Sequence, residues 1–185
     1  MPITITEALA EIKTIDKRIK AKREYVGGFL ARQEGIKDPL EKDGGCFQMI
    51  TRERQAIGDL ERRIINLRRG IQLANDQTEV AIEGTSRSIS DWLSWKRDVM
   101  PGQKSFLAAV RSKLTNIRDT AKRQGAMVVA PGATPAALTD FVININEQEL
   151  AAEIETMETV LGTLDGQLSL KNATVPIVEH KIGTL

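Results

Sequence analysis

The sequence predicts a mainly α-helical protein: an antiparallel helical hairpin plus a third and a fourth helix, with a small β-hairpin and an extended C-terminal arm. Two observations support this fold class. Apolar residues recur at alternating steps of three and four along two long segments, and a loop rich in Gly and Asp separates the segments. Aromatic residues make up only 4% of the chain, which fits a core of Ile, Leu and Ala better than an aromatic-lined ligand pocket.

The first apolar ladder runs from Ile5 to Phe29 and predicts the first helix. Thr4 and Glu7 have the spacing of a capping box, so the helix should begin there. Gly27-Gly28 predicts either a kink or close packing on the backbone, because two glycines cost about 2 kcal/mol of helix propensity relative to alanines. The residues expected to form the packing seam of this helix are Ile12, Ile15 and Ile19.

The second ladder predicts a helix over about 47–74. Each ladder has one charged residue at a seam position, Lys22 in the first and Glu53 in the second. Asp38-Pro39 and Asp43-Gly44-Gly45 mark the intervening segment as a loop. Helices joined in this way fold back as an antiparallel hairpin. The seam residues of the second helix are Ile57, Leu60, Ile64, Leu67 and Ile71.

A small β-hairpin and a third helix follow. The segments 78–82 and 85–89 read as strands, with Glu83-Gly84 as the turn between them. Ser88 or Ser90 can cap the third helix, which should break or kink at Pro101-Gly102 and continue with heptad-spaced apolar residues to Ala121.

The last third of the chain predicts a linker, a helix and an arm. We expect three parts: a helical domain over 1–124, a Gly/Ala/Pro linker over 125–140, and an acidic helix with an extended arm over 141–185. A short strand is expected at 141–145, and Asn146 with Glu149 should cap the fourth helix. The tail from Gln167 has strand-like runs around Pro176, so it should form an edge strand or an arm laid on a neighbour.

Charge is distributed unevenly along the chain. Residues 1–124 hold 24 Lys or Arg against 17 Asp or Glu, a net charge of +7. Residues 125–170 hold seven acids and no basic residue. The two regions should therefore attract each other, either within one chain or between neighbouring copies, and the sequence leaves both arrangements open.

Residues suited to catalysis or metal binding are scarce. His180 is the only histidine and Cys46 the only cysteine, which excludes a Cys/His zinc site and an internal disulfide, and is compatible with a reducing cytoplasm. Glu149/Glu153 and Glu155/Glu158 fit a solvated helix face better than an acid/base pair. No phosphate loop or Glu-x-x-His motif is present. We expect a non-enzymatic protein without cofactor or metal.

Membrane and nucleic-acid contacts are not expected either. The first residues lack a basic region followed by an apolar core, and no segment is apolar enough to cross a bilayer. The second helix carries the arginine pairs Arg62/Arg63 and Arg68/Arg69, but acids are interleaved with its basic residues. Such a mixed-charge face predicts a solvated surface rather than a phosphate-binding one.

Motifs along most of the chain resemble a small uncharacterised helical-hairpin family of bacteria and phages, and its closest likeness is to structural proteins of tailed bacteriophages. The motifs are Glu7-Ala8-Leu9, Asp16-Lys17-Arg18-Ile19, Arg32-Gln33-Glu34-Gly35, Asp38-Pro39, Ile65-Asn66, Glu83-Gly84-Thr85, Trp92-Leu93-Ser94-Trp95 and the segment 166–174. The resemblance implies a virion component made in the host cytoplasm and without catalysis.

From this resemblance we expect a head-associated auxiliary or cementing protein, that is, a decoration or minor capsid protein. Its partners would be shell or connector subunits and copies of itself. Two alternatives stay open: a neck or tail structural protein, and a free cytosolic oligomeric helical binding module. The residues expected to contact partners are Trp92, Trp95, Leu168, Leu170, Val175, Ile177 and Val178.

Overall fold

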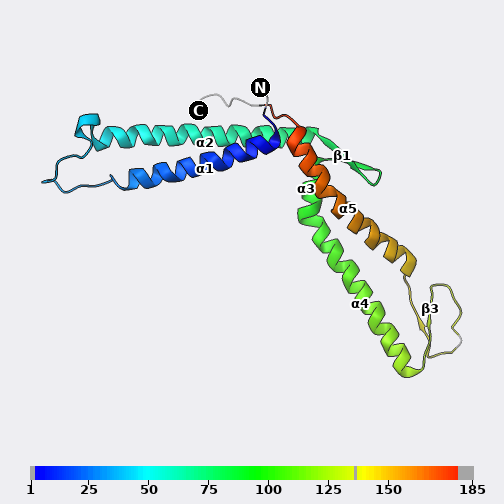
Figure 1. Ribbon diagram of the computed structural model, residues 1–185. Helices are drawn as coiled ribbons and strands as arrows, with labels where there is room; N and C mark the ends of the chain where they lie inside the picture. Colours follow the sequence, from blue (N-terminus) through cyan, green and yellow to red (C-terminus); the bar gives the residue numbers. More distant parts are fainter. Residues whose placement is uncertain (1–2, 136, 179–185) are drawn as a thin grey trace. The chain divides into compact units, whose positions relative to one another are not determined.

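The computed structural model describes residues 3–135 and 137–178 and is mainly α-helical (Figure 1). The chain divides into two compact units. The first unit comprises Met1–Thr78 and Ser169–Leu185, and the second comprises Glu79–Leu168. The predicted fold class is confirmed: an antiparallel helical hairpin, further helices and a small β-hairpin are all present. Within the described residues, none of the helices is apolar over a stretch long enough to span a membrane.

The first unit is built on helices α1 (Ile5–Gly27) and α2 (Gly45–Gln77), which lie side by side (Figure 1). The predicted capping box begins α1: the Thr4 hydroxyl accepts from the Glu7 amide at 3.3 Å, and the Glu7 carboxylate accepts from the Thr4 amide at 2.7 Å. The glycine pair ends α1, with Gly28 as its C-cap. It neither kinks the helix nor receives a close neighbour at Gly27.

One apolar cluster joins the two helices. Ile12, Ile15, Ile19 and Leu67 are buried in it, and the other seam residues pack against it half-buried: Ile57, Leu60, Ile64 and Ile71. The two charged seam residues meet across the hairpin, where Lys22 Nζ lies 2.6 Å from Glu53 Oε2. The charged position of one ladder therefore lies opposite the charged position of the other, an arrangement that favours this register of the two helices.

The extended segment after α5 (Glu147–Thr174) packs on the hairpin of its own chain. Ile5 N donates to the Val175 carbonyl at 3.2 Å, and Ile177 N donates to the Ile3 carbonyl at 2.8 Å. Ile177 is buried in the cluster that joins α1 and α2. The expectation that Ile177 reaches a neighbouring subunit is therefore wrong, whereas Val175 packs beside it half-buried. Residues 179–185, which include His180, lie outside the described residues.

The second unit begins with the β-hairpin of β1 (Glu79–Ile82) and β2 (Thr85–Ser88), as predicted. Its turn residues Glu83 and Gly84 both have positive φ, the conformation of the two-residue turns that match strand twist. α3 (Ile89–Ser94), the π-helical turn η2 (Trp95–Val99) and α4 (Met100–Gln124) then follow without a break.

Pro101 explains the π-helical turn. Proline has no amide hydrogen, and its ring displaces the carbonyl four residues earlier, that of Arg97. The chain accommodates this with one wider turn, in which Met100 N donates to the Trp95 carbonyl. The expected kink at Pro101-Gly102 is therefore a local widening, and α4 continues to Gly125, which closes it in the left-handed conformation.

The segment expected to be a linker contains a strand, β3 (Val128–Val129), which pairs in parallel with β4 (Phe141–Val142). α5 then returns along α4, so Leu114 and Leu150 share one cluster, as do Leu107 and Met157. The domain boundaries expected after residues 124 and 140 do not coincide with the observed units, because this pairing keeps 79–168 together.

The strand-like interpretation of Leu168-Ser169-Leu170 is wrong, because these residues lie in α5. Leu164 and Leu168 continue the helical spacing of Leu150 and Met157 and are buried against the β-hairpin and Trp92. An alternating pattern of only three residues is a weaker predictor of secondary structure than a helical apolar spacing that extends over several turns. The helix stops only at Thr174, two residues before Pro176.

Candidate functional site

The loop end of the α1–α2 hairpin exposes large apolar side chains. We call this the tip surface and define it by Tyr25, Leu30, Ile36 and Phe47. Their exposed fractions are 46%, 70%, 54% and 82%, respectively. Phe29 stacks edge to face on Tyr25, with ring centroids 5.1 Å apart. A group of large apolar side chains left in water is typical of a protein contact rather than of a reaction site.

Asp38 fixes the loop that carries the tip surface. Its carboxylate accepts from the Leu40 amide at 2.8 Å, from the Cys46 amide at 2.9 Å and from Cys46 Sγ at 3.0 Å. Cys46 is in the first turn of α2, where unpaired amides and the helix dipole favour an anion. The loop is thereby tied to the helix that follows it, and Phe47 projects from an anchored turn.

The same contact sets the protonation of both groups. Hydrogen bonds from the Cys46 thiol and amide lower the pKa of Asp38. The bond to Asp38, followed by burial, raises the pKa of Cys46. A catalytic cysteine requires the opposite shift, since the thiolate is the nucleophile. The raised pKa of Cys46 disfavours the thiolate, which is the opposite of what a nucleophilic cysteine needs.

The basic residues of α2 lie among acids. Arg63 Nε is 2.8 Å from Glu11 Oε1, and Arg23 of α1 is 2.7 Å from Glu61 of α2. Arg62 pairs with Asp59. Ion pairs of this kind leave Arg62 and Arg63 with little free charge for a phosphate backbone. Among the described residues, the other arginines of α2 make no ion pair: Arg52, Arg54, Arg68 and Arg69. In the described part of the chain, no cluster of three or more His, Cys, Asp or Glu residues is placed to hold a metal ion.

The two tryptophans expected to contact partners lie inside the second unit. Trp92 is buried, and its Nε1 donates to the Val80 carbonyl at 2.9 Å. Trp95 stacks edge to face on Trp92, with centroids 5.7 Å apart, and donates to Gln103. Trp92 is therefore a core residue, which corrects the expectation that it contacts a partner. Trp95, half-buried, lines a groove beside it.

The remaining expected contact residues are also dispersed. Leu168 is buried in the second unit, which excludes it as a partner contact. Leu170 and Val178 are exposed by 58% and 75% and stay available. The tip surface was missed at the sequence level because its residues lie off the apolar ladders or at their ends. Leu30 and Ile36, large apolar residues within a loop of charged residues and Gly, were the signal that could have revealed it.

Comparison of the chain with models of known protein families, with curated proteins and with solved structures finds no match. The functional conclusion therefore depends on the residues and their arrangement.

Proposed function

We propose that the protein is a non-enzymatic structural component of a larger assembly, the virion of a tailed phage, which it joins through the tip surface of the α1–α2 hairpin. The single observation that carries this proposal is the exposure of Tyr25, Leu30, Ile36 and Phe47 at one end of a helical pair. The phage assignment rests on the motif resemblance. A head-associated cementing role comes first, and a neck or tail position is the second possibility.

The α1–α2 hairpin suits this role because, away from the tip surface, its apolar seam is already covered by residues of its own chain. Its seam is filled by its own side chains, including the ion pair of Lys22 and Glu53, and Ile177 closes one end. Burying a large apolar side chain in a partner contributes about 1.5–3 kcal/mol. Several such side chains on an anchored loop provide the central apolar contacts that stable interfaces need.

Mass spectrometry of particles purified from the source phage tests the assignment. We expect the chain to be present in a fixed ratio to the shell or tail subunits. Its absence from intact particles, together with free protein in the lysate, would overturn the virion proposal and favour the cytosolic binding module.

A pair of variants tests the tip surface. Leu30→Ser combined with Phe47→Ser should leave the fold intact, since both side chains lie in solvent, but should remove the protein from purified particles. Ile65→Ser on the middle of α2, where the side chain is 52% exposed, is the matched control and should be incorporated normally. Equal incorporation of both variants would show that the tip is not the contact.

A further inference from the structure

A long groove separates α4 from α5 in the second unit. Two adjoining hollows of about 440 and 380 Å³ share Arg111, Thr115, Ile154 and Glu158, so they form one groove. We call it the α4–α5 groove. It lies on the other side of the Leu107–Met157 contact from the hollow that the β-hairpin helps to line. Its apolar floor is formed by Leu107, Leu114, Leu150, Ile154 and Met157.

The charges that line this groove are sorted by helix. All three charged residues on the α4 wall are basic: Lys104, Arg111 and Arg118, spaced seven residues apart. All three charged residues on the α5 wall are acidic: Glu147, Glu155 and Glu158. Seven residues are about two helical turns, so the bases form a straight row along one wall.

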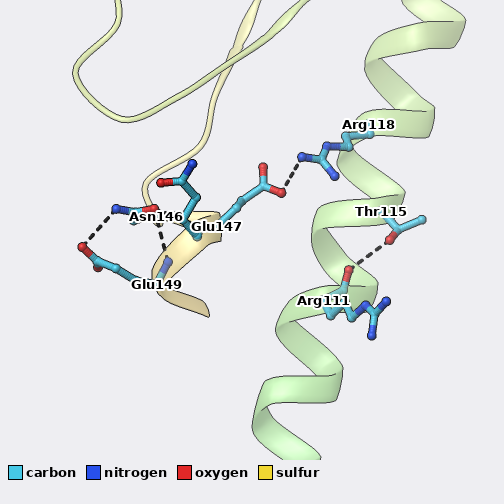
Figure 2. A network of polar contacts seen from close by, with 7 residues as sticks. Arg111, Thr115, Arg118, Asn146, Glu147 and Glu149 are labelled. Atoms are coloured by element: carbon cyan, nitrogen blue, oxygen red, sulfur yellow. Dashed lines mark hydrogen bonds and ion pairs between the residues drawn. The ribbon is translucent and has the colours of Figure 1, made fainter. Parts of the chain in front are cut away.

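Within the part of the chain that the structure describes, one ion pair joins the two walls. Figure 2 shows the Arg118 guanidinium and the Glu147 carboxylate pointing toward each other at the end of the groove, where Asn146 caps α5. Among the described residues, the side chains of Lys104, Arg111, Glu155 and Glu158 make no ion pair. Leu114 of α4 and Leu150 of α5 are buried in one cluster, so the two helices meet at the apolar floor and the charged walls rise beside it.

We propose that the α4–α5 groove is an interface between two copies of this chain, which stack groove against groove about a twofold axis parallel to the helices. A rotation about such an axis keeps each residue at its own height along the helices and sets α4 of one copy on α5 of the other. The row of bases on each α4 would then face the row of acids on each α5 of the second copy.

The alternative arrangement brings like charges together. A twofold axis that runs across the helices would set α4 on α4, with Lys104, Arg111 and Arg118 facing the same residues of the second copy. Like charges in direct opposition are strongly disfavoured at interfaces. The charge sorting therefore selects both the occupant and the orientation, because the surface is complementary to itself under one rotation only.

The shape of the walls fits this occupant. Ala108, Ser112 and Thr115 on α4 and Ala151 on α5 are small, which lets a second helical layer approach the apolar floor. Two stacked pairs would form a four-helix bundle, in which neighbouring helices from different copies run antiparallel. This interface uses other residues than the tip surface, so the proposal does not depend on the proposed virion function.

Charge reversal with the full-length protein tests the interface. Sedimentation velocity should show a salt-sensitive dimer of the wild type, and R111E or E158K alone should each weaken it about tenfold or more. Mixing the two variants should restore dimerisation, because the acid introduced on α4 of one chain then meets the base introduced on α5 of the other. K113E and E153K make the same charge changes off the groove and should leave the dimer unchanged. Circular dichroism verifies that each variant is folded.

Two results would overturn the proposal. One is a wild-type chain that stays monomeric up to millimolar concentration; the other is a dimer that R111E and E158K leave as strong as K113E and E153K do. Either result leaves the presence of the protein in particles to be decided separately, so failure here is distinguishable from failure of the proposed function.

Disulfide trapping tests the orientation. On a Cys46→Ser background, a mixture of Thr115→Cys and Ala151→Cys chains should form a crosslinked heterodimer under mild oxidation, since these positions lie at similar heights on opposite walls. Crosslinking of Thr115→Cys with itself, in place of the mixed product, would show α4 on α4 and would refute the proposed axis.

Discussion

The two helical pairs of this protein share one sequence pattern, heptad-spaced apolar residues. They differ in how fully the apolar face between their helices is covered by the rest of the chain. α1 and α2 approach closely, and their cluster includes Ile177 from the end of the chain. α4 and α5 stay farther apart and keep an open groove along one side. A heptad seam therefore brings two helices together but does not by itself cover them. The first pair is covered by Ile177 of its own chain. The second pair is covered in part by Ile143 of its own chain, and we infer that its open groove is covered by another copy.

The placement of charge follows the same division. In the first pair, opposite charges close across the seam, as Lys22 does with Glu53 and Arg63 with Glu11. In the second pair, the groove walls carry one sign each, and among the described residues the only ion pair between the walls is that of Arg118 with Glu147. Interleaved charges complete a hairpin internally, whereas sorted charges leave it able to recognise an oppositely sorted surface.

Truncation of one leucine in each pair should give the largest effect and should differ between the pairs. Leu67→Ala removes a fully buried side chain from the complete seam and should destabilise the first unit by about 3 kcal/mol. Leu114→Ala lies beside the open groove, where the space it leaves is connected to solvent, and should cost the second unit about 2 kcal/mol, the lower end of the range for such truncations.

Urea denaturation measures both effects in one chain. The two tryptophans, Trp92 and Trp95, belong to the second unit, so their fluorescence reports its unfolding, whereas circular dichroism reports helices of both units. Leu67→Ala should shift the dichroism transition more than the fluorescence transition. Equal losses of stability for the two substitutions would contradict the conclusion that the α1–α2 seam is more fully covered than the α4–α5 seam.

The ion pair within the first seam should give an intermediate effect. Lys22→Ala leaves the Glu53 carboxylate, only 16% exposed, without its partner and should cost about 2 kcal/mol. The double change Lys22→Leu with Glu53→Leu should be close to neutral, because two apolar side chains of similar size continue the ladders. Thermal denaturation of Lys22→Leu, of Glu53→Leu and of the double variant completes the cycle.

An exposed pair on the same helix provides the control. Lys20 lies 3.9 Å from Glu24 with both side chains largely in solvent, and Lys20→Ala should change stability by no more than about 0.5 kcal/mol. A Lys22→Ala cost as small as that of Lys20→Ala would mean that the seam pair does not hold the register.

Gly70 and Gly58 on α2 test whether the segment 177–178 is a fixed part of the first unit. A Cβ at Gly70 would lie 2.9 Å from the Val178 carbonyl and 3.3 Å from Ile177, whereas a Cβ at Gly58 would meet nothing within 4 Å. Gly58→Ala should stabilise the helix by up to about 1 kcal/mol. Gly70→Ala should lose that gain and destabilise by about 1 kcal/mol, as it displaces Ile177.

Limited proteolysis distinguishes displacement of the segment from a general loss of stability. Cleavage near the C-terminus should become faster in Gly70→Ala and stay unchanged in Gly58→Ala. If both variants are stabilised and equally resistant, the segment after Pro176 is not held against α2.

The helices were predictable because each leaves a local signature. The capping box at Thr4, the two ladders and the turn at Glu83-Gly84 all act within a few residues, and all appear as expected. The sequence even marked Lys22 and Glu53 as exceptions in their ladders. Their pairing could not be predicted, because it depends on how the two helices align, and no signal within a few residues specifies that alignment.

The errors arose where long-range packing decides. The run Leu168-Ser169-Leu170 alternates like a strand, but a seam set by residues of the second unit keeps it helical. Likewise, Ile177 looked like an arm for a neighbour because nothing near it in sequence could receive it; α1 and α2, more than a hundred residues away, do. The tip surface was missed for the converse reason, since its apolar residues have no regular period.

The contact between Asp38 and Cys46 should give the smallest effect on stability but a measurable one on reactivity. Because the pKa of Asp38 is lowered in the folded chain, its hydrogen bonds stabilise the fold above the ordinary aspartate pKa and are lost as the pH falls through the lowered value. Because the pKa of Cys46 is raised, the contribution of the thiol is present below the ordinary thiol pKa and is lost as the pH rises through the raised value.

Alkylation of Cys46 measures this contact directly. Asp38→Asn removes the charge that raises the pKa of the Cys46 thiol, so alkylation at about pH 8 should become several-fold faster. Asp43→Asn, in the same loop, makes the same change away from the thiol and should leave the rate unaltered. If Asp38→Asn also leaves it unaltered, the tip loop is not fixed through this contact, and Phe47 and its neighbours would have to be held in place by the partner rather than presented to it by an anchored turn.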